Sequence, residues 1–433
     1  MRKRLLNILF WSVLSAAFIG PGTITTAASA GTGFGFTLLW ALLFSTIACI
    51  ILQEASARLT LSSGKNLGEA MKLRFQESLA GKITGYLVLI SILLGCAAYE
   101  AGNILGGVAG AALISNVPAF ILTLIIGLVA FLLLWFGSTK VIAQILGIIV
   151  AIMGFCFFTT AILMKPPIDS ILNSALIPRF PTGSEILIIG LIGTTVVPYN
   201  LFLGSGIKHT QNIKEMRFSL TAAIILGGII SMAVLIVGTS ISGEFTYDAL
   251  AGSLGDTLGS WASLFFGIGL FAAGLSSALT APLAAALTAK GFMGSESDEN
   301  WKDAGTYMKL VWGSVLMIGV FFGVLQVQPI PAIILAQALN GIILPFVTIF
   351  LLLVMNDASL LNRSSINSHA YNLLMGIIVF TTLVIGLTNV AKALNNISDA
   401  ALVNEEYILY AATVIALFVA WPVIHKIKEY RKR

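Results

Sequence analysis

The sequence predicts an all-α polytopic membrane protein. Of its 433 residues, 58% are hydrophobic and only 10% are charged, whereas a soluble domain carries roughly 25% charged residues. Apolar runs of nearly 20 residues, the length that a helix needs to cross a bilayer, recur from one end of the chain to the other. Because short alternating segments are absent, a membrane β-barrel is not expected.

Twelve spans are expected from length and hydropathy. They cover 8–30, 35–57, 84–113, 117–136, 138–163, 184–206, 214–241, 257–289, 306–325, 329–355, 367–391 and 406–424. The basic start of the chain followed by an apolar run resembles a signal peptide, but no convincing cleavage site follows, so we interpret it as span 1. We therefore expect one transmembrane domain over 1–424 and a basic cytoplasmic tail over 425–433, which serves mainly as a topology anchor.

The positions of the lysines and arginines test this span count. With the N-terminus inside, all but three of the 24 basic residues fall in cytoplasmic segments, the exceptions being Lys165, Arg179 and Lys392. A wrong number of spans would scramble this asymmetry. Both termini are therefore expected in the cytoplasm, with the protein in a bacterial inner (cytoplasmic) membrane.

Two of the expected spans are interrupted. Gly20-Pro21-Gly22-Thr23 breaks the first, and Gly193 to Asn200, with Pro198 inside it, breaks the sixth. Proline removes a backbone donor and clashes with the preceding turn. In lipid, freed backbone groups are tolerated only where protein or a water-filled cavity satisfies them. Breaks at matching positions of two halves point to a transporter site.

The spans divide into two repeats. Spans 1–5 (8–163) and spans 6–10 (184–355) each begin with a broken helix, and an odd number of spans makes the second repeat inverted in the membrane. This is the 5+5 inverted-repeat plan of LeuT-type transporters. Spans 11 and 12 (367–424) are expected to be peripheral additions.

The acidic residues are informative because almost none lies deep in a span. Glu54, near the cytoplasmic end of span 2, is expected to pair with Arg58 four residues later. Glu100 alone sits deep, in span 3, and a buried ionisable residue in a span is a functional hypothesis by default. Burial favours its neutral form, which suits a proton carrier. The alternative is a hydrogen-bonded structural glutamic acid.

The breaks themselves offer neutral groups. The half-helix after each break begins with free N–H groups, which favour anions. Hydroxyls and amides accompany them, and span 10 adds Gln337 and Asn340 on one helical face. Ser276 and Ser277 of span 8 are candidates to join span 1 carbonyls around a coupling Na⁺. For any single hydroxyl, the alternative is ordinary hydrogen bonding between helices.

Other functional classes find no support in the sequence. The three histidines form no ligand cluster, and the three cysteines lie inside apolar runs as packing residues. No phosphate-binding loop is present, so ATP-driven transport would need a separate subunit. We expect no enzyme activity, no cofactor and no nucleic-acid partner, because no nucleophile–base pair or cofactor motif is visible.

Three segments resemble the NRAMP family of divalent metal transporters. The stretch from Gly20 to Met71 is similar to the family's spans 1–2, 194–205 (TTVVPYNLFLGS) to its span 6 motif, and 335–346 (LAQALNGIILPF) to its span 10. The likeness runs through spans 1–10 in order. It implies the LeuT-type fold and a transport function.

The resemblance fails where a metal would bind. The family's span 1 motif Asp-Pro-Gly-Asn has Gly20 at the Asp position and Thr23 at the Asn position. Its span 6 Met-Pro-His corresponds to Val197-Pro198-Tyr199. Losing a carboxylate and a soft thioether together removes the basis of transition-metal selectivity.

The family's other ion-site positions are only partly retained in this sequence. The second span 6 histidine falls at Gly204, and the acidic pair of span 3 maps to Glu100 and Asn103, so one acid is left. Gln337 matches the span 10 glutamine that approaches the ion in the family. No metal site is predicted with confidence.

These observations lead to a hypothesis with two alternatives. We expect a secondary transporter for a small anion or zwitterion, such as bicarbonate or a short carboxylate, coupled to H⁺ or Na⁺. The alternatives are a divalent metal carrier, for instance of hydrated Mg²⁺, and a non-transporting sensor or channel. The predicted residues are Gly20, Gly22, Thr23, Thr195, Val197, Tyr199, Asn200 and Gln337 for the cargo, Glu100 and Asn103 for the proton or gate, and Ser276 and Ser277 for a coupling ion. The oligomeric state is left open.

Overall fold

The computed structural model describes residues 19–75, 79–136, 139–206, 212–294, 298–302, 305–397 and 405–432. All regular structure within these ranges is helical. Eleven helices of the described chain are long and apolar enough to cross a membrane, and each matches one of the expected spans 2–12. Residues 8–18 of the expected first span lie outside the described ranges, and its second half forms α2 (Pro21–Phe34).

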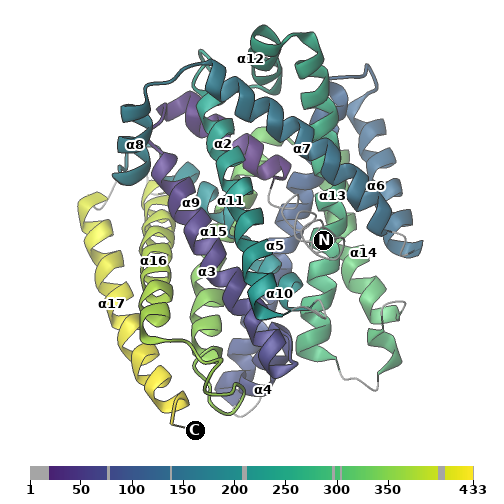
Figure 1. Cartoon of the computed structure of the whole chain (residues 1–433). Coiled ribbons are helices and arrows are strands. Elements are labelled where there is room, and N and C mark those ends of the chain that lie inside the picture. Colours follow the sequence, from purple (N-terminus) through teal and green to yellow (C-terminus); the bar gives the residue numbers. More distant parts are fainter. Residues whose placement is uncertain are drawn as a thin grey trace.

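The helices run roughly side by side in an elongated bundle (Figure 1). The spanning elements after α2 are α3 (Leu39–Ser63), α5 (Leu79–Ala112), α6 (Ala119–Phe136), α7 (Thr139–Leu163), α9 (Glu185–Thr195), α10 (Pro198–Gly206), α11 (Ile213–Gly238), α13 (Ser260–Met293), α14 (Thr306–Val324), α15 (Pro329–Val354), α16 (His369–Ile397) and α17 (Glu405–Tyr430). Here α9 and α10 are the two halves of the broken sixth span. The shorter elements, for which the sequence analysis made no prediction, are α4 (Leu67–Phe75), α8 (Ile168–Leu176), α12 (Tyr247–Leu258) and the 3₁₀ turn η1 (Glu299–Trp301).

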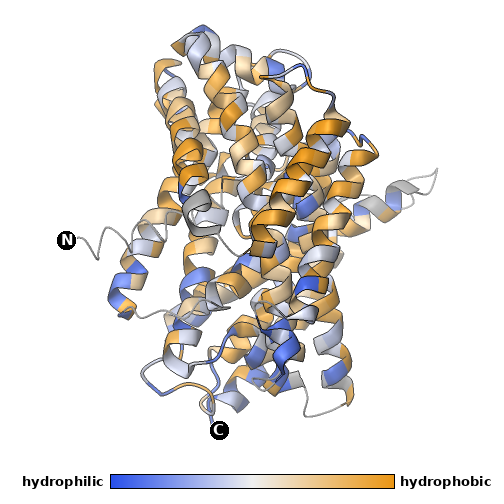
Figure 2. Cartoon of the chain, turned by 90° about the vertical axis from the view of Figure 1, so that its right-hand side faces the viewer, coloured by the Kyte–Doolittle hydropathy of each residue, from blue (hydrophilic) through white to orange (hydrophobic). Residues whose placement is uncertain are grey.

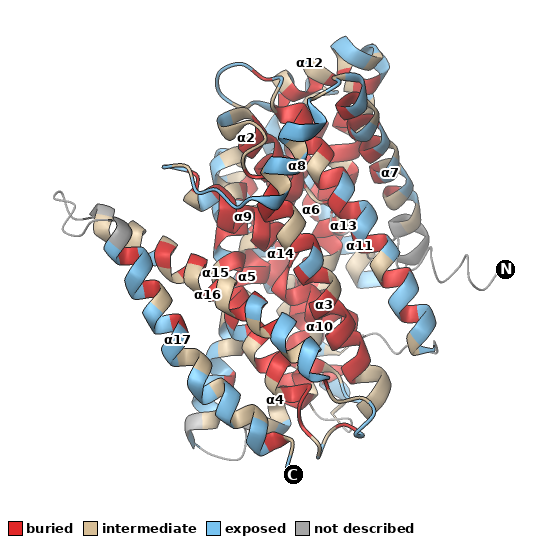
Figure 3. Ribbon diagram, turned by 60° about the vertical axis from the view of Figure 1, so that its left-hand side comes forward, coloured by how far each residue is buried: buried red, intermediate tan, exposed pale blue. Residues whose placement is uncertain are grey.

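Burial separates central from peripheral helices. In the 18-residue apolar segment of the α9–α10 span, 94% of the residues are buried, whereas in that of α17 only 17% are buried. Figure 3 shows this contrast, with α3, α9 and α10 mostly buried and α17 exposed along much of its length. Apolar residues dominate the helices (Figure 2), and many large apolar side chains are exposed, as expected where lipid replaces water around the bundle.

Small residues let the central helices touch backbone to backbone. A Cβ atom added at Gly274 of α13 would lie 2.5 Å from the Cα of Gly107 in α5. Close approach at glycine is a common way to pack helices in membranes, because lipid is as apolar as leucine and gives no hydrophobic drive between helices. The pair α5–α13 therefore forms a tight central contact beside the broken spans.

Helix α17 continues to Tyr430, six residues beyond the expected end of span 12 at residue 424. The end of the helix is held by the loop that joins α15 to α16. Arg431 donates to the Asn356 side chain and to the Asn367 carbonyl, and the Ala358 N–H donates to the Tyr430 carbonyl. These tertiary contacts extend the helix beyond the apolar run, where hydropathy ends the span.

Candidate functional site

The first break opens directly into α2. Gly20 is extended (φ −86°, ψ 174°), and Pro21 occupies the first helical position. Proline is favoured there because its missing N–H would have no helical partner anyway. No acidic residue lies in the first turn of α2. The positive end of this half-helix therefore has no acidic side chain within its own first turn.

The second break repeats the first. Helix α9 ends at Thr195, Val196 and Val197 are not helical, and α10 begins with Pro198. The Asn200 N–H turns back to the Val197 carbonyl at 3.1 Å. The first turn of α10 also has no acidic residue. Each of these half-helices thus starts with proline and presents a positive end.

A hydroxyl pair joins the two breaks. The Oγ1 atoms of Thr23 and Thr194 lie 3.0 Å apart, and both side chains are buried. The structure therefore brings the two breaks to the same depth, as the inverted-repeat plan requires. The Thr195 hydroxyl instead donates to the Leu191 carbonyl of its own helix at 2.9 Å, so the predicted cargo residue Thr195 is already bonded.

The side chain of Gln337 in α15 packs against the first break. A Cβ atom added at Gly22 would overlap the Gln337 Nε2 atom, so only glycine leaves room for this amide. Thr26 also reaches this region, because both Thr26 and Gln337 border Gly190 of α9. Asn340, one turn further along α15, donates to the Gly95 carbonyl of α5 at 3.3 Å and to the Ala336 carbonyl of its own helix. The Asn340 amide is therefore engaged in hydrogen bonds that join α15 to α5.

Several buried polar atoms near the breaks have no hydrogen-bond partner within the described ranges. They are both side-chain amide atoms of Asn200, the hydroxyl of Thr26 and Oε1 of Gln337. Most buried polar groups in proteins are paired, and each unpaired one costs about 1–3 kcal/mol. The unpaired atoms of Asn200, Thr26 and Gln337 are therefore candidates for ligand contacts beside the two breaks.

Tyr199, next to Asn200, packs edge-on against Tyr99 of α5, with ring centroids 5.2 Å apart. The Tyr99 hydroxyl donates to the Gly193 carbonyl at 2.8 Å, close to the end of α9. The sequence analysis did not single out Tyr99, although its position next to Glu100 was a signal. Val197, between the two half-helices, is also buried.

Glu100 is fully buried and lies one turn from Asn103, whose amide donates to its Oε2 at 3.3 Å. Its other oxygen, Oε1, has no partner among the residues described. A Cβ atom added at Gly319 of α14 would lie 2.7 Å from the Glu100 Cγ, so the carboxyl side chain packs against that helix. The predicted pair of Glu100 and Asn103 is thus formed at the interface between α5 and α14.

The two serines of α13 differ. A Cβ atom at Gly20 would lie 3.2 Å from the Ser277 Oγ, so Ser277 faces the first break. Ser276 donates to the Ala273 carbonyl of its own helix at 3.1 Å. Of the two predicted coupling-ion residues, the geometry brings only Ser277 next to span 1.

No group of three or more His, Cys, Asp or Glu side chains that could hold a metal ion is found in the described part of the chain. The residues at the breaks are hydroxyls, amides and backbone N–H groups. Such groups can bind anions through their N–H and O–H donors or hard cations through their oxygens, whereas a soft transition-metal site uses imidazole, thiolate or thioether ligands.

A membrane-embedded bundle with two proline-started half-helices meeting at its centre defines a transporter of the LeuT-like class. The family model "Natural resistance-associated macrophage protein-like" matches residues 12–392, so the chain belongs to the NRAMP family. The resemblance noted in the sequence is thereby confirmed.

The relatives of this chain are described as metal transporters. It is 26% identical to the divalent metal cation transporter MntH of Caldanaerobacter subterraneus subsp. tengcongensis over 368 residues, which are 80% of this chain and 83% of the relative. It is 28% identical to the protein of the same description from Deinococcus radiodurans over 313 residues, 67% of this chain and 70% of the relative. These descriptions favour the divalent metal alternative over the anion hypothesis.

Solved structures support the fold. The Eremococcus coleocola manganese transporter, in complex with an aromatic bis-isothiourea compound, superposes with a TM-score of 0.73 at 17% identity, covering 99% of this chain and 96% of that one. The nucleobase-cation-symport-1 family transporter Mhp1 gives a TM-score of 0.60 at 13% identity, covering 98% of this chain and 92% of that one. The predicted all-α LeuT-type fold is confirmed.

Proposed function

We propose that this NRAMP-family transporter works by alternating access and carries a small anion or zwitterion, such as bicarbonate or a short carboxylate. The observation behind this proposal is the pair of positive half-helix ends, α2 and α10, with no acid in either first turn. In transporters with discontinuous helices, such ends point at anionic groups of the substrate.

The groups around the breaks suit an anion. Backbone N–H groups in the first turn of α2, at the positive end of the helix, can donate to a bound oxygen. The buried amide of Asn200 is without a partner in the described structure and supplies another donor through Nδ2. A zwitterion would in addition use Oε1 of Gln337, an acceptor that is equally unpaired.

A divalent cation is the second candidate, and the descriptions of the relatives favour it. Asn200 Oδ1 and Gln337 Oε1 are neutral acceptors, and Mg²⁺ keeps several of its waters when it binds. Glu100 would be the acidic group available to such an ion. A non-transporting sensor or channel would show no saturable, gradient-coupled flux.

The variant Asn200→Asp separates these candidates. A carboxylate at this buried position repels an anion and attracts a cation, so bicarbonate or acetate uptake should fall at least tenfold, which corresponds to about 1.4 kcal/mol. Divalent metal uptake should rise instead. Uptake by the purified protein in liposomes, with an imposed pH or Na⁺ gradient, measures both and shows which ion is coupled.

The control is Asn173→Asp on the exposed surface of α8, which makes the same charge change away from the breaks. Unchanged anion uptake in Asn200→Asp, together with saturable Mn²⁺ or Mg²⁺ uptake by the unmodified protein, would replace the anion proposal with the metal one. No gradient-coupled flux of any tested solute would favour the sensor reading.

The contact between Gly22 and Gln337 gives a second prediction. Because a methyl group at residue 22 overlaps the Gln337 amide, Gly22→Ala must move this amide away from the break. Transport should fall sharply, whereas the unfolding temperature should change little, because the displaced group is the far end of a flexible side chain. Gly33→Ala in the same helix is the matched control, since a Cβ there meets no atom within 4 Å. Equal transport by Gly22→Ala and Gly33→Ala would show that the contact between Gly22 and Gln337 is not needed for transport.

We also propose that the end of the bundle holding α4 and the end of α17 faces the cytoplasm of a bacterial cell. Arg74 of α4 pairs with Asp357, in the same loop that meets Tyr430. Most basic residues of the sequence are expected at this end, which agrees with the positive-inside rule. Protease or tag accessibility in inside-out vesicles measures this orientation.

A further inference from the structure

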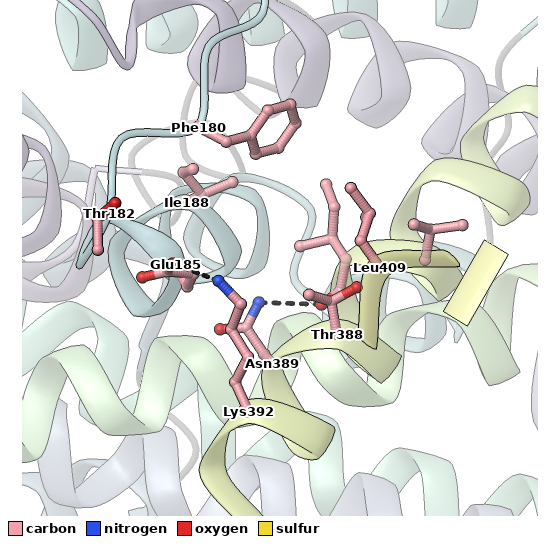
Figure 4. Close-up of a pocket in the computed structure, with 10 residues that line it drawn as sticks. Phe180, Thr182, Glu185, Ile188, Thr388, Asn389, Lys392 and Leu409 are labelled. Atoms are coloured by element: carbon pink, nitrogen blue, oxygen red, sulfur yellow. Dashed lines mark hydrogen bonds and ion pairs between the residues drawn. The ribbon is translucent and has the colours of Figure 1, made fainter. Parts of the chain in front are cut away.

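A cavity of about 260 Å³ lies where α9, α16 and α17 meet, at the end of the bundle remote from the C-terminus (Figure 4). Its lining residues are Phe180, Thr182, Glu185, Ile188, Val384, Ile385, Thr388, Asn389, Lys392 and Leu409. None of them belongs to either break. The cavity is therefore separate from the cargo site, although α9 forms a wall of the cavity and also carries Thr194.

The lining changes from polar to apolar along the membrane normal. On α16, Lys392 lies near the helix end, and Ile385 and Val384 lie about 10–12 Å deeper than Lys392 at 1.5 Å per residue, with Asn389 in between. On α9, Glu185 is the first helical residue and Ile188 follows one turn deeper. A membrane lipid has the same order of groups, with a polar head at the surface and an apolar chain below.

The polar end contains a charged pair and an unpaired hydroxyl. Lys392 Nζ lies 2.6 Å from Glu185 Oε1, and both side chains keep some exposure. The Thr388 side chain is nine-tenths buried, and its Oγ1 has no hydrogen-bond partner in the ranges described. Figure 4 shows Thr388 between Asn389 and Leu409 at the cavity. A phosphate or ester oxygen would satisfy this hydroxyl and contact the ammonium.

The bilayer itself adjoins the cavity. Its outer wall is Leu409 of α17, the least buried spanning helix, and the neighbouring Tyr407 and Tyr410 are exposed. We propose that a phospholipid of this leaflet binds here, with its phosphate and glycerol region at Lys392 and Thr388. The first part of one acyl chain then lies between Ile188 and Ile385.

A cavity-filling variant tests the proposal. Leu409→Trp places an indole at the outer wall, and Leu417→Trp makes the same change at an exposed site on the same helix that does not line the cavity. Native mass spectrometry of the purified full-length protein with added phosphatidylglycerol should show about tenfold weaker binding of one lipid for Leu409→Trp only. The thermal shift caused by this lipid should be lost in the same variant.

A milder variant, a phosphate control and the mass of the complex complete the test. Thr388→Val keeps the shape but removes the hydroxyl, and should weaken lipid binding about fivefold, the size of one hydrogen bond. Inorganic phosphate alone should not stabilise the protein, because the apolar part of the cavity contributes to binding. Equal lipid binding in Leu409→Trp and Leu417→Trp, stabilisation by phosphate alone, or a mass showing that a second chain covers the cavity would each overturn the proposal.

Discussion

The two ends of the bundle are held together by different means. At the end that carries α4, Glu54 of α3 accepts from Arg58, from Arg217 of α11 and from Tyr371 of α16. At the opposite end, the ion pair Glu185–Lys392 joins α9 to α16, beside neutral hydrogen bonds such as that from the Trp40 indole to the Arg179 carbonyl. A carrier that alternates between two openings must break the contacts at one end while keeping those at the other.

The comparison indicates which end needs more free energy to open. The Glu54 carboxylate is buried and linked to three helices, so opening that end exposes or strands several charges. The Glu185–Lys392 pair is partly exposed and is replaced by water at little cost. Among the described residues, buried charged contacts are therefore concentrated at the α4 end of the bundle.

The largest effect is expected from Glu54→Gln. Removing the carboxylate charge leaves Arg58 buried without its counter-ion, which costs about 3–5 kcal/mol. The unfolding temperature of the purified protein should fall markedly. Glu215→Gln, an exposed site on α11 two residues before Arg217, is the control and should have little effect. A small loss of stability in Glu54→Gln would mean that the contacts to Glu54 do not stabilise this end of the bundle.

A medium effect is expected from Tyr371→Phe. The change removes only the hydroxyl that donates to Glu54 at 2.6 Å, and a hydrogen bond to a charged group is worth about 1.5–3 kcal/mol. Thermal unfolding measures the loss. Tyr307→Phe, at an exposed tyrosine on α14, serves as the control. A loss equal to that of Glu54→Gln would show that Tyr371, rather than the arginines, fixes the carboxylate.

The smallest effect is expected from Glu185→Gln. A partly exposed pair contributes about 0–1 kcal/mol, so stability should hardly change. If opening of this end limits transport, the variant should transport at the same rate or slightly faster in a liposome uptake assay. A stability loss as large as that of Glu54→Gln would remove the difference between the two ends.

The sequence predicted more of the helices than of the contacts between them. Hydropathy located the spans, and the i,i+4 spacing correctly paired Glu54 with Arg58, because both signals are local. Arg217 and Tyr371 lie far away in the chain, and no local pattern connects them to Glu54. The short helices α4, α8 and α12 were also missed, since none of them needs a long apolar run.

At the site, the sequence located both breaks but not how they are joined. Proline and glycine mark where a helix stops, and this is why Pro21 and Pro198 were informative. The Thr23–Thr194 bond and the contact of Gln337 with Gly22 depend on how the two repeats pack together. The same dependence explains why Ser277, rather than Ser276, faces the first break.

The absence of fixed charge at the breaks has an electrical consequence. The sequence has no Asp, Glu, Lys or Arg between residues 5 and 53 or between 186 and 207. A cargo ion held there crosses the bilayer with its own charge uncompensated by these segments. A potential that is negative inside opposes entry of a monoanion by about 2.3 kcal/mol per 100 mV and favours entry of a cation equally. Inward transport of an anion against this potential therefore needs a driving force, either its own concentration gradient or co-transported cations, and the sign of the transport current reports the net charge moved in each cycle.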